Sequence, residues 1–321
     1  MKMFVRCLAL VAGLTVGISS HAAFAKYPDT SRRITLIVPF AAGGSNDILA
    51  HEIAQRMSQD WRLPVIVMNV VGGSGAIGAE RVARSQPDGY TVLMVSSSYT
   101  INSAVTKSLP YDPDTSFAGV SLLGKAPMVL AVAKTVPASN AAELLAYVRS
   151  HPGKLNYGAV GVGSVNTMAV ELLKRLGKLD IMGAPYRAGN EAVNDLIGNH
   201  LDMFVGSFPQ MISLTRAHAA TAIAVTGSRR SDAEPALPTL AEAGIDGYEL
   251  EQWWGIVVPA KTPKEIVDVL NSELNAVMKS PDVGAFMKSE GARPTPSTPE
   301  AFDKHLHAEL ARWRDLVRHG P

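Results

Sequence analysis

Cysteine is almost absent from this sequence. Cys7 is the one cysteine among 321 residues, and it lies in a short apolar run near the N-terminus. Because that run belongs to a predicted export signal, the chain that remains after cleavage would contain no cysteine. Disulfide bonds, thiolate catalysis and cysteine metal sites are therefore excluded for it.

Charge is scarce and balanced. Charged residues make up 18% of the chain, and 30 Lys and Arg stand against 29 Asp and Glu, which leaves a formal net charge of +1. Binding to polyanions needs a marked positive excess, so we expect no nucleic-acid partner. The 47% of hydrophobic residues, together with 27 Gly and 20 Pro, indicates a globular fold with many short loops.

Long hydrophobic runs are missing too. The apolar stretch 7–18 is shorter than the roughly 20 residues that cross a bilayer. It follows Lys2 and Arg6 and precedes the small-residue site Ala23-Phe24-Ala25, an order typical of a secretory signal peptide. We expect residues 1–25 to be a signal peptide cleaved after Ala25, and the product to be exported without a membrane anchor.

Beyond this signal, strand-like and helix-like segments alternate. Continuous apolar runs of strand length occur at residues 34–38, 65–68, 91–95, 128–132 and 221–225, with amphipathic runs of helix length between several of them. Strands that helices cover on both faces have such continuous runs, and they are typical of parallel sheets. The predicted fold class is α/β, with mainly parallel sheets and helices on both faces.

The last third of the chain changes character. After an apolar run at 255–258 the pattern predicts only helices, at residues 262–278, 281–289 and 298–316. Helices without strands of their own must pack on an earlier sheet. We therefore expect a discontinuous first domain of residues 26–123 plus 252–321, and an inserted second domain of residues 124–251.

A glycine-rich loop at residues 39–47 opens the first helix. Gly43 and Gly44 let the backbone turn tightly and expose N–H groups, while Ser45, Asn46 or Asp47 can cap the helix. A helix N-terminus with free amides can bind an anion without a basic side chain. An ordinary tight turn would use the same residues, so the loop alone leaves both interpretations open.

A second glycine-rich loop, at residues 72–78, contains the pattern G-x-G-x-x-G. A dinucleotide site would also need an Asp or Glu about 20 residues further on, but the next strand ends in Ser96-Ser97-Ser98. We therefore expect no nicotinamide and no other cofactor. A packing role against the first loop is the alternative.

Neutral donors recur elsewhere, whereas catalytic groups do not. Residues 157–167 bring glycines, Ser164 and Asn166 to another predicted helix N-terminus. No nucleophile stands beside a base, and His305 and His307 are two residues apart on a helix, so they point in different directions. We predict no metal site and no enzyme. Trp253-Trp254 would line a ligand or fill the core between the domains, and packing is the commoner role.

Several ordered segments resemble the Bug family, the periplasmic solute-binding receptors of tripartite tricarboxylate transporters. The matching segments are residues 38–47, 72–78, 87–91, 109–112, 185–187 and 238–244. The resemblance extends over nearly the whole chain beyond the signal. It implies a periplasmic protein with a two-domain Venus-flytrap fold, type II-like, that closes on a small organic carboxylate.

The family resemblance also implies a partner and a set of ligand-binding residues. The ligand would be delivered to membrane transporter subunits; presentation to a sensor kinase, or an exported enzyme, are the alternatives, and we expect a monomer. Backbone amides, hydroxyls and waters would hold the ligand. The implied set is Phe40, Gly43, Gly44, Asn46, Asp47, Ser97, Ser98, Gly163, Ser164, Asn166, Tyr186 and Ser207.

The sequence departs from the family pattern in three places. Val165, Asn166 and Thr167 stand where Ser and then His are usual, and Ala188 replaces the usual Gly. Gly206-Ser207 follows Phe204-Val205 where many members have an acidic residue, which disfavours a ligand with an amino group. The charge of Asp47 would repel an anion, so we expect its carboxylate to turn away and cap the helix, leaving only its N–H in the site.

Overall fold

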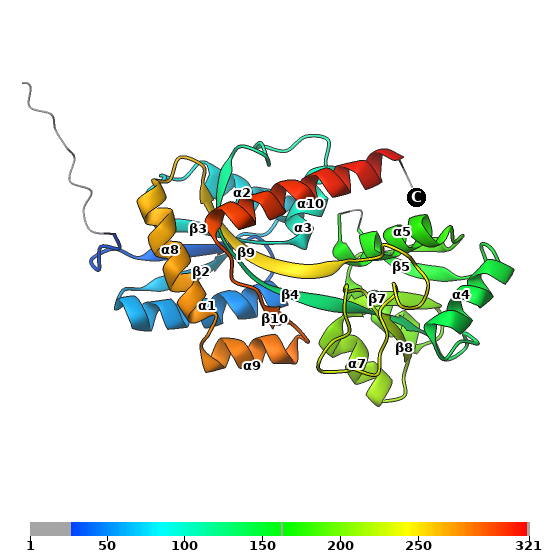
Figure 1. Cartoon of the computed structure of the whole chain (residues 1–321). Coiled ribbons are helices and arrows are strands. Elements are labelled where there is room, and N and C mark those ends of the chain that lie inside the picture. The colour runs from blue at the N-terminus through cyan, green and yellow to red at the C-terminus, as the bar shows by residue number, and fades with distance from the viewer. Residues whose placement is uncertain (1–26, 162, 320–321) are drawn as a thin grey trace, which may run out of the picture.

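The computed structural model describes residues 27–161 and 163–319. The predicted signal peptide, residues 1–25, lies outside them. Figure 1 shows two lobes that are joined by two long strands. In chain order the elements are β1 (Ile34–Val38), α1 (Ser45–Trp61), β2 (Val65–Asn69), the short 3-10 turn η1 (Gly73–Gly75), α2 (Ala76–Ala83), β3 (Thr91–Ser96), α3 (Ser97–Val105), β4 (Phe117–Val132), α4 (Ala141–Ser150), β5 (Asn156–Val160), α5 (Val165–Gly177), β6 (Met182–Tyr186), α6 (Gly189–Ile197), β7 (Met203–Ser207), α7 (Phe208–Arg216), β8 (Thr221–Val225), β9 (Glu251–Pro259), α8 (Lys264–Val277), α9 (Pro281–Ser289), β10 (Arg293–Pro294) and α10 (Pro299–His319).

The strands follow the order β2-β1-β3-β9-β4-β7-β5-β6, with β8 and β10 paired to β4 off this path. Parallel pairs form at both ends. The pairs of β1 with β2 and β3 agree with the apolar runs at 34–38, 65–68 and 91–95, whereas β5, β6 and β7 were not among the predicted strands. The centre differs, because β4 is antiparallel to β7, β8, β9 and β10. A continuous apolar run shows that a strand is covered on both faces, but it carries no information on strand direction.

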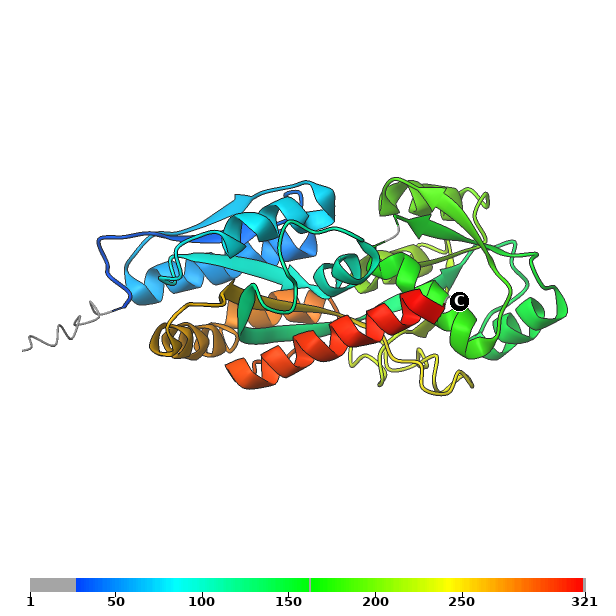
Figure 2. The same cartoon turned by 90° about the horizontal axis from the view of Figure 1, so that it is seen from above.

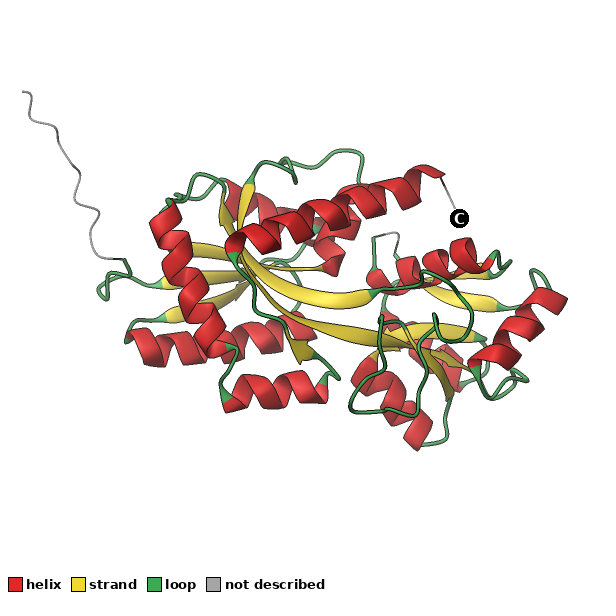
Figure 3. Cartoon of the chain, in the orientation of Figure 1, coloured by secondary structure: helices red, strands yellow, loops and turns green. Residues whose placement is uncertain are grey.

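Strand β4 belongs to both lobes. Along one edge its residues pair first with β9 and then with β8, and along the other edge with β10 and then with β7. We call the part with β1, β2, β3, β9 and β10 the first lobe and the part with β5 to β8 the second lobe. Helices cover the faces of the sheet in both lobes (Figure 3). Because β4 runs through without a break, it connects the two lobes directly.

The predicted C-terminal helices pack on the first lobe's sheet, as expected. Leu270 and Leu274 of α8 share a buried cluster with Ile34 and Leu36 of β1, and Phe302 of α10 shares another with strand residues of the same lobe. The two-residue strand β10 was missed, because a segment that short has no periodicity to detect. Within the described ranges, no helix is both long and apolar enough to cross a membrane.

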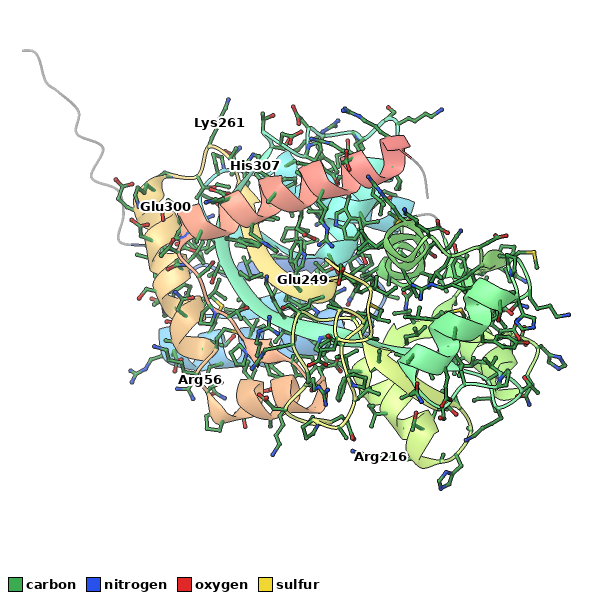
Figure 4. All side chains as sticks on the ribbon, turned by 45° about the vertical axis from the view of Figure 1, so that its right-hand side comes forward. Arg56, Arg216, Glu249, Lys261, Glu300 and His307 are labelled. Carbon is green, nitrogen blue, oxygen red and sulfur yellow. The ribbon has the colours of Figure 1, made fainter. Side chains whose placement is uncertain are left out.

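Helix α10 also reaches the second lobe. Trp313 and Leu316, near its end, belong to the buried cluster of that lobe, and Figure 2 shows the helix running beside both lobes. Arg312 donates a hydrogen bond to the backbone oxygen of Glu249, which lies just before β9 where the lobes meet (Figure 4). The last helix therefore braces the junction that β4 and β9 form.

Candidate ligand-binding site

The first glycine loop holds the carboxylate of Asp47 on its inner side. Gly43 N donates to Asp47 Oδ2 at 2.9 Å, and Asn69 Nδ2 donates to Asp47 Oδ1 at 2.7 Å and to Phe40 O at 3.1 Å. Burial raises the pKa of this carboxyl, but the hydrogen bonds from Gly43 and Asn69 outweigh it and lower the pKa below its usual value. The charge of Asp47 is thus compensated by the loop itself and by the end of β2.

The predicted cap at Asp47 is wrong in detail. Helix α1 has Gly44 at its N-cap and no side-chain cap, and the N–H of Asp47 donates to Gly44 O at 2.9 Å instead of pointing into a site. The reason is the left-handed conformation of Gly43, with φ of 85°, which brings its N–H to the carboxylate. The uncapped first turn of α1 therefore keeps the positive end of the helix dipole available to a ligand.

Glu290 contributes to this end of α1 from a distant part of the chain. Ser45 Oγ donates to Glu290 Oε2 at 2.8 Å, and burial raises the pKa of Glu290 while the Ser45 bond offsets this in part. Beside it, Asn46 Oδ1 is buried with no hydrogen-bond partner among the described residues. Sequence reasoning missed Glu290, since it lies 245 positions from Ser45 and no local pattern links them.

The second glycine loop packs against the first, as the alternative interpretation predicted. A Cβ on Gly78 would lie 2.9 Å from Pro39 Cβ, and one on Gly75 would lie 3.6 Å from the Phe40 ring. A side chain at Gly78 would therefore push Pro39 of the first loop out of place, whereas one at Gly75 would make ordinary contacts with it. The glycines of residues 72–78 therefore serve close packing, and the loop supports Phe40.

The serines after β3 lie at the start of α3. Ser97 and Ser98 are the first two residues of this helix rather than strand residues, and Ser96 is its N-cap. Ser96 and Ser97 are 2% and 1% exposed, and their hydroxyls have no hydrogen-bond partner in the described part of the chain. A buried hydroxyl without a partner costs about 1–3 kcal/mol, so these two groups are candidates to bind a ligand or a water. Ser96 was not in the predicted set, although it belongs to the same serine run.

In the second lobe, Ser164 and Asn166 are occupied by structural bonds. Ser164 is the N-cap of α5, where its Oγ accepts from Thr167 N at 3.2 Å. Asn166 Nδ2 donates to Val205 O at 2.8 Å and so ties α5 to β7. The predicted side-chain donors are thus partly used by the fold, and the first backbone amides of α5 remain candidates for binding an anion.

Tyr186 and Ser207 end the strands β6 and β7. Tyr186 OH donates to Asp195 Oδ2 at 2.8 Å, and burial together with that bond raises its pKa to about 12. Ser207 precedes α7 without capping it. A Cβ on the neighbouring Gly206 would lie 2.7 Å from Met211 Cε, so a side chain at this position would require Met211 of α7 to move.

Two contacts bring these groups of residues together. A Cβ on Gly163 would lie 3.2 Å from Asn102 Oδ1 of α3, the helix that begins with Ser97 and Ser98. Gly291, which follows Glu290, is packed so closely on Phe208 that a Cβ would lie 2.6 Å from its ring, and Phe208 follows Ser207. The predicted residues of the two lobes therefore lie on either side of the same junction.

Other candidates are structural. Trp253 and Trp254 are buried in β9 within the clusters of the first lobe, so the packing role is confirmed. In residues 27–161 and 163–319, no group of three or more His, Cys, Asp or Glu side chains is placed to hold a metal ion.

Comparison with known proteins gives one consistent picture. Residues 49–320 match the family described as "Tripartite tricarboxylate transporter family receptor", or TctC. The solved structure of the periplasmic binding protein BugD is 31% identical with a TM-score of 0.77, covering 90% of this chain and 97% of that one. R. palustris Rpa4515 with adipate is 33% identical, with a TM-score of 0.80 and 90% and 98% covered. MatC (Rpa3494) from Rhodopseudomonas palustris with bound malate is 31% identical, with a TM-score of 0.76 and 89% and 99% covered.

These likenesses confirm the predicted α/β fold of a two-domain periplasmic binding protein. The family consists of solute-binding receptors rather than enzymes, so the prediction that the chain is not an enzyme is confirmed as well. The chain belongs to the TctC, or Bug, family of periplasmic solute-binding receptors.

Proposed function

We propose that this protein is a periplasmic receptor that captures a small carboxylate without an amino group between its two lobes and delivers it to the membrane subunits of a tripartite tricarboxylate transporter. The uncapped N-terminus of α1 carries the proposal, since its amides lie beside a carboxylate already compensated by Gly43 and Asn69. The proposed domains are residues 26–123 plus 252–321 and residues 124–251, with binding closing them about β4 and β9.

Three further observations support a carboxylate. Two structural relatives contain adipate and malate. The buried hydroxyls of Ser96 and Ser97 stand at the start of a second helix, and helix N-termini favour anions. Gly206 leaves no acidic neighbour for an ammonium group, so an amino acid would bind less well than its deaminated analogue.

A calorimetric screen of organic acids on the exported protein tests the proposal. Gly44→Val tests the site without disturbing the fold, because Gly44 has an ordinary φ of -84° and a Cβ there would meet only Ala41 O, at 4.0 Å. We expect Gly44→Val to fold and to lose binding, since the new side chain covers the amides at the start of α1. The control is Gly284→Ala, where a Cβ meets nothing within 4 Å.

Binding of an organic acid by the wild type and by Gly284→Ala, with loss in Gly44→Val, supports the proposal. Tight binding by Gly44→Val, or preference for an amino acid over its deaminated analogue, contradicts it. Export is tested separately by mass spectrometry of the secreted form, which should begin near Lys26; a product that retains residues 1–25 would disprove the cleavage.

A further inference from the structure

An apolar cavity of about 500 Å³ lies at the carboxyl ends of β5 and β6. Its walls come from both lobes, since Val105 ends α3 and Leu316 and Val317 lie near the end of α10, while Met168 and Pro185 belong to the second lobe. The α5 and α10 ends that enclose it are near each other in Figure 1. Ligands of α/β proteins bind outside the carboxyl ends of parallel strands, so the cavity is in a suitable place for one.

The cavity borders the predicted ligand loop directly. Ser164 Oγ bonds to two of its lining residues, Thr167 Oγ1 at 3.1 Å and Gly161 O at 3.4 Å. A Cβ on Gly163 would lie 3.4 Å from Val105 Cγ2, and Tyr186 is itself part of the wall. A ligand whose carboxylate is held between the lobes, by the starts of α1 and α5 together, therefore has its remaining atoms within reach of this cavity.

The polar groups in the wall already have partners. Thr167 is bonded to Ser164, Tyr186 OH donates to Asp195, and Glu171 accepts from Tyr157 OH and, at 3.0 Å, from Lys174 Nζ. Among the described residues, no lysine or arginine lines the cavity. A second carboxylate placed against these walls would lose part of its hydration without gaining a cation, which is unfavourable.

We propose that this cavity receives the apolar part of the ligand, so that the substrate class is monocarboxylic acids with an alkyl or aryl body. This inference rests on the proposed function. The size agrees, because an apolar cavity of about 150 Å³ is enough to hold benzene, and this one is larger. Acids with two carboxylates would have to leave the cavity unused or bury a charge in it.

A matched series of ligands tests the inference on the exported protein. Calorimetry with acetate, butyrate and hexanoate should show affinity rising by about fourfold for each buried methylene. Adipate has the same carbon chain as hexanoate and a second carboxylate, and we expect it to bind at least about tenfold more weakly.

One variant should reverse this preference. Val317 is 43% exposed on α10, so Val317→Arg places a cation at the cavity without disturbing the core. This variant should raise the affinity for adipate relative to that for hexanoate by about tenfold, which is the effect of one hydrogen bond between charged groups. The control is Ile66→Arg, on β2 of the first lobe, because Ile66 is equally exposed at 41%.

The possible outcomes are distinct. The inference is supported if affinity rises from acetate to hexanoate, if adipate binds weakly, and if Val317→Arg, but not Ile66→Arg, shifts the preference toward adipate. If short or dicarboxylic acids bind at least as tightly as hexanoate, or if both arginine variants behave alike, the inference is wrong while the proposed function stands. If no carboxylate binds to the wild type, the proposed function fails, and the inference fails with it.

Discussion

Arg314 and Asp315, neighbours near the end of α10, are ion-paired to opposite lobes. Arg314 binds Asp114 of the first lobe with two parallel bonds of 2.7 and 3.0 Å, and Asp315 accepts from Arg175 of α5 in the second lobe at 3.2 Å. One turn of helix thus connects both halves of the molecule through charge, in addition to the buried Trp313 and Leu316.

Arg314→Ala should lower the free energy of unfolding by about 0.5–1 kcal/mol, because the pair is partly exposed and the solvent weakens it. Urea unfolding at low and at high salt measures this, and the difference from wild type should shrink as salt screens the charges. Arg175→Ala, which removes a single bond, should have a smaller effect. A loss that salt does not change would point to packing of the Arg314 stem instead.

Gly291→Ala should weaken both stability and ligand binding. Gly291 has φ of 61° and its Cβ would lie 2.6 Å from Phe208, so the alanine forces the segment after α9 away from α7. This also displaces Glu290 from Ser45. Calorimetry and urea unfolding check the change. The double variant Gly291→Ala with Phe208→Ala removes the clash and should recover part of the affinity; no recovery would exclude the clash as the cause.

Asp47→Asn should keep most of the ligand affinity and still destabilise the fold. The carboxylate accepts from two donors, Gly43 N and Asn69 Nδ2, and an amide can accept with only one of its two terminal atoms. We expect a loss of about 1–2 kcal/mol in unfolding free energy with at most a modest change in affinity. Loss of binding at unchanged stability would show that the Asp47 carboxylate contacts the ligand.

Stability should fall as pH rises through the titration of Glu290. Its folded-state pKa lies above the ordinary value of 4.5 because of burial, so the folded state binds the proton more tightly than the unfolded state does. The contribution is full below the ordinary pKa and is lost as pH rises through the raised one. Urea unfolding of Glu290→Gln across this range should show a flatter dependence than the wild type. Identical slopes would assign the effect to another group.

The sequence by itself determined the α/β character, several of the strands and helices, and the positions of the glycine loops. Apolar periodicity and glycine placement are local properties, so they indicate β1, α1 and the loop between them without knowledge of the fold. The same holds for the absence of an acidic residue at Gly206, whereas the packing role of residues 72–78 was only one alternative until the structure showed Gly78 against Pro39.

Only the tertiary structure decided which polar groups are free. Asn69 and Glu290 approach the start of α1 from other elements, and Val205 takes up the side-chain amide of Asn166. The antiparallel pairing of β4 with β9, which joins the lobes, is likewise a contact between segments far apart in the chain. Hydrogen bonds between residues far apart in the chain depend on how elements pack, and the energy of that packing is spread over many residues, so no single segment of sequence contains it.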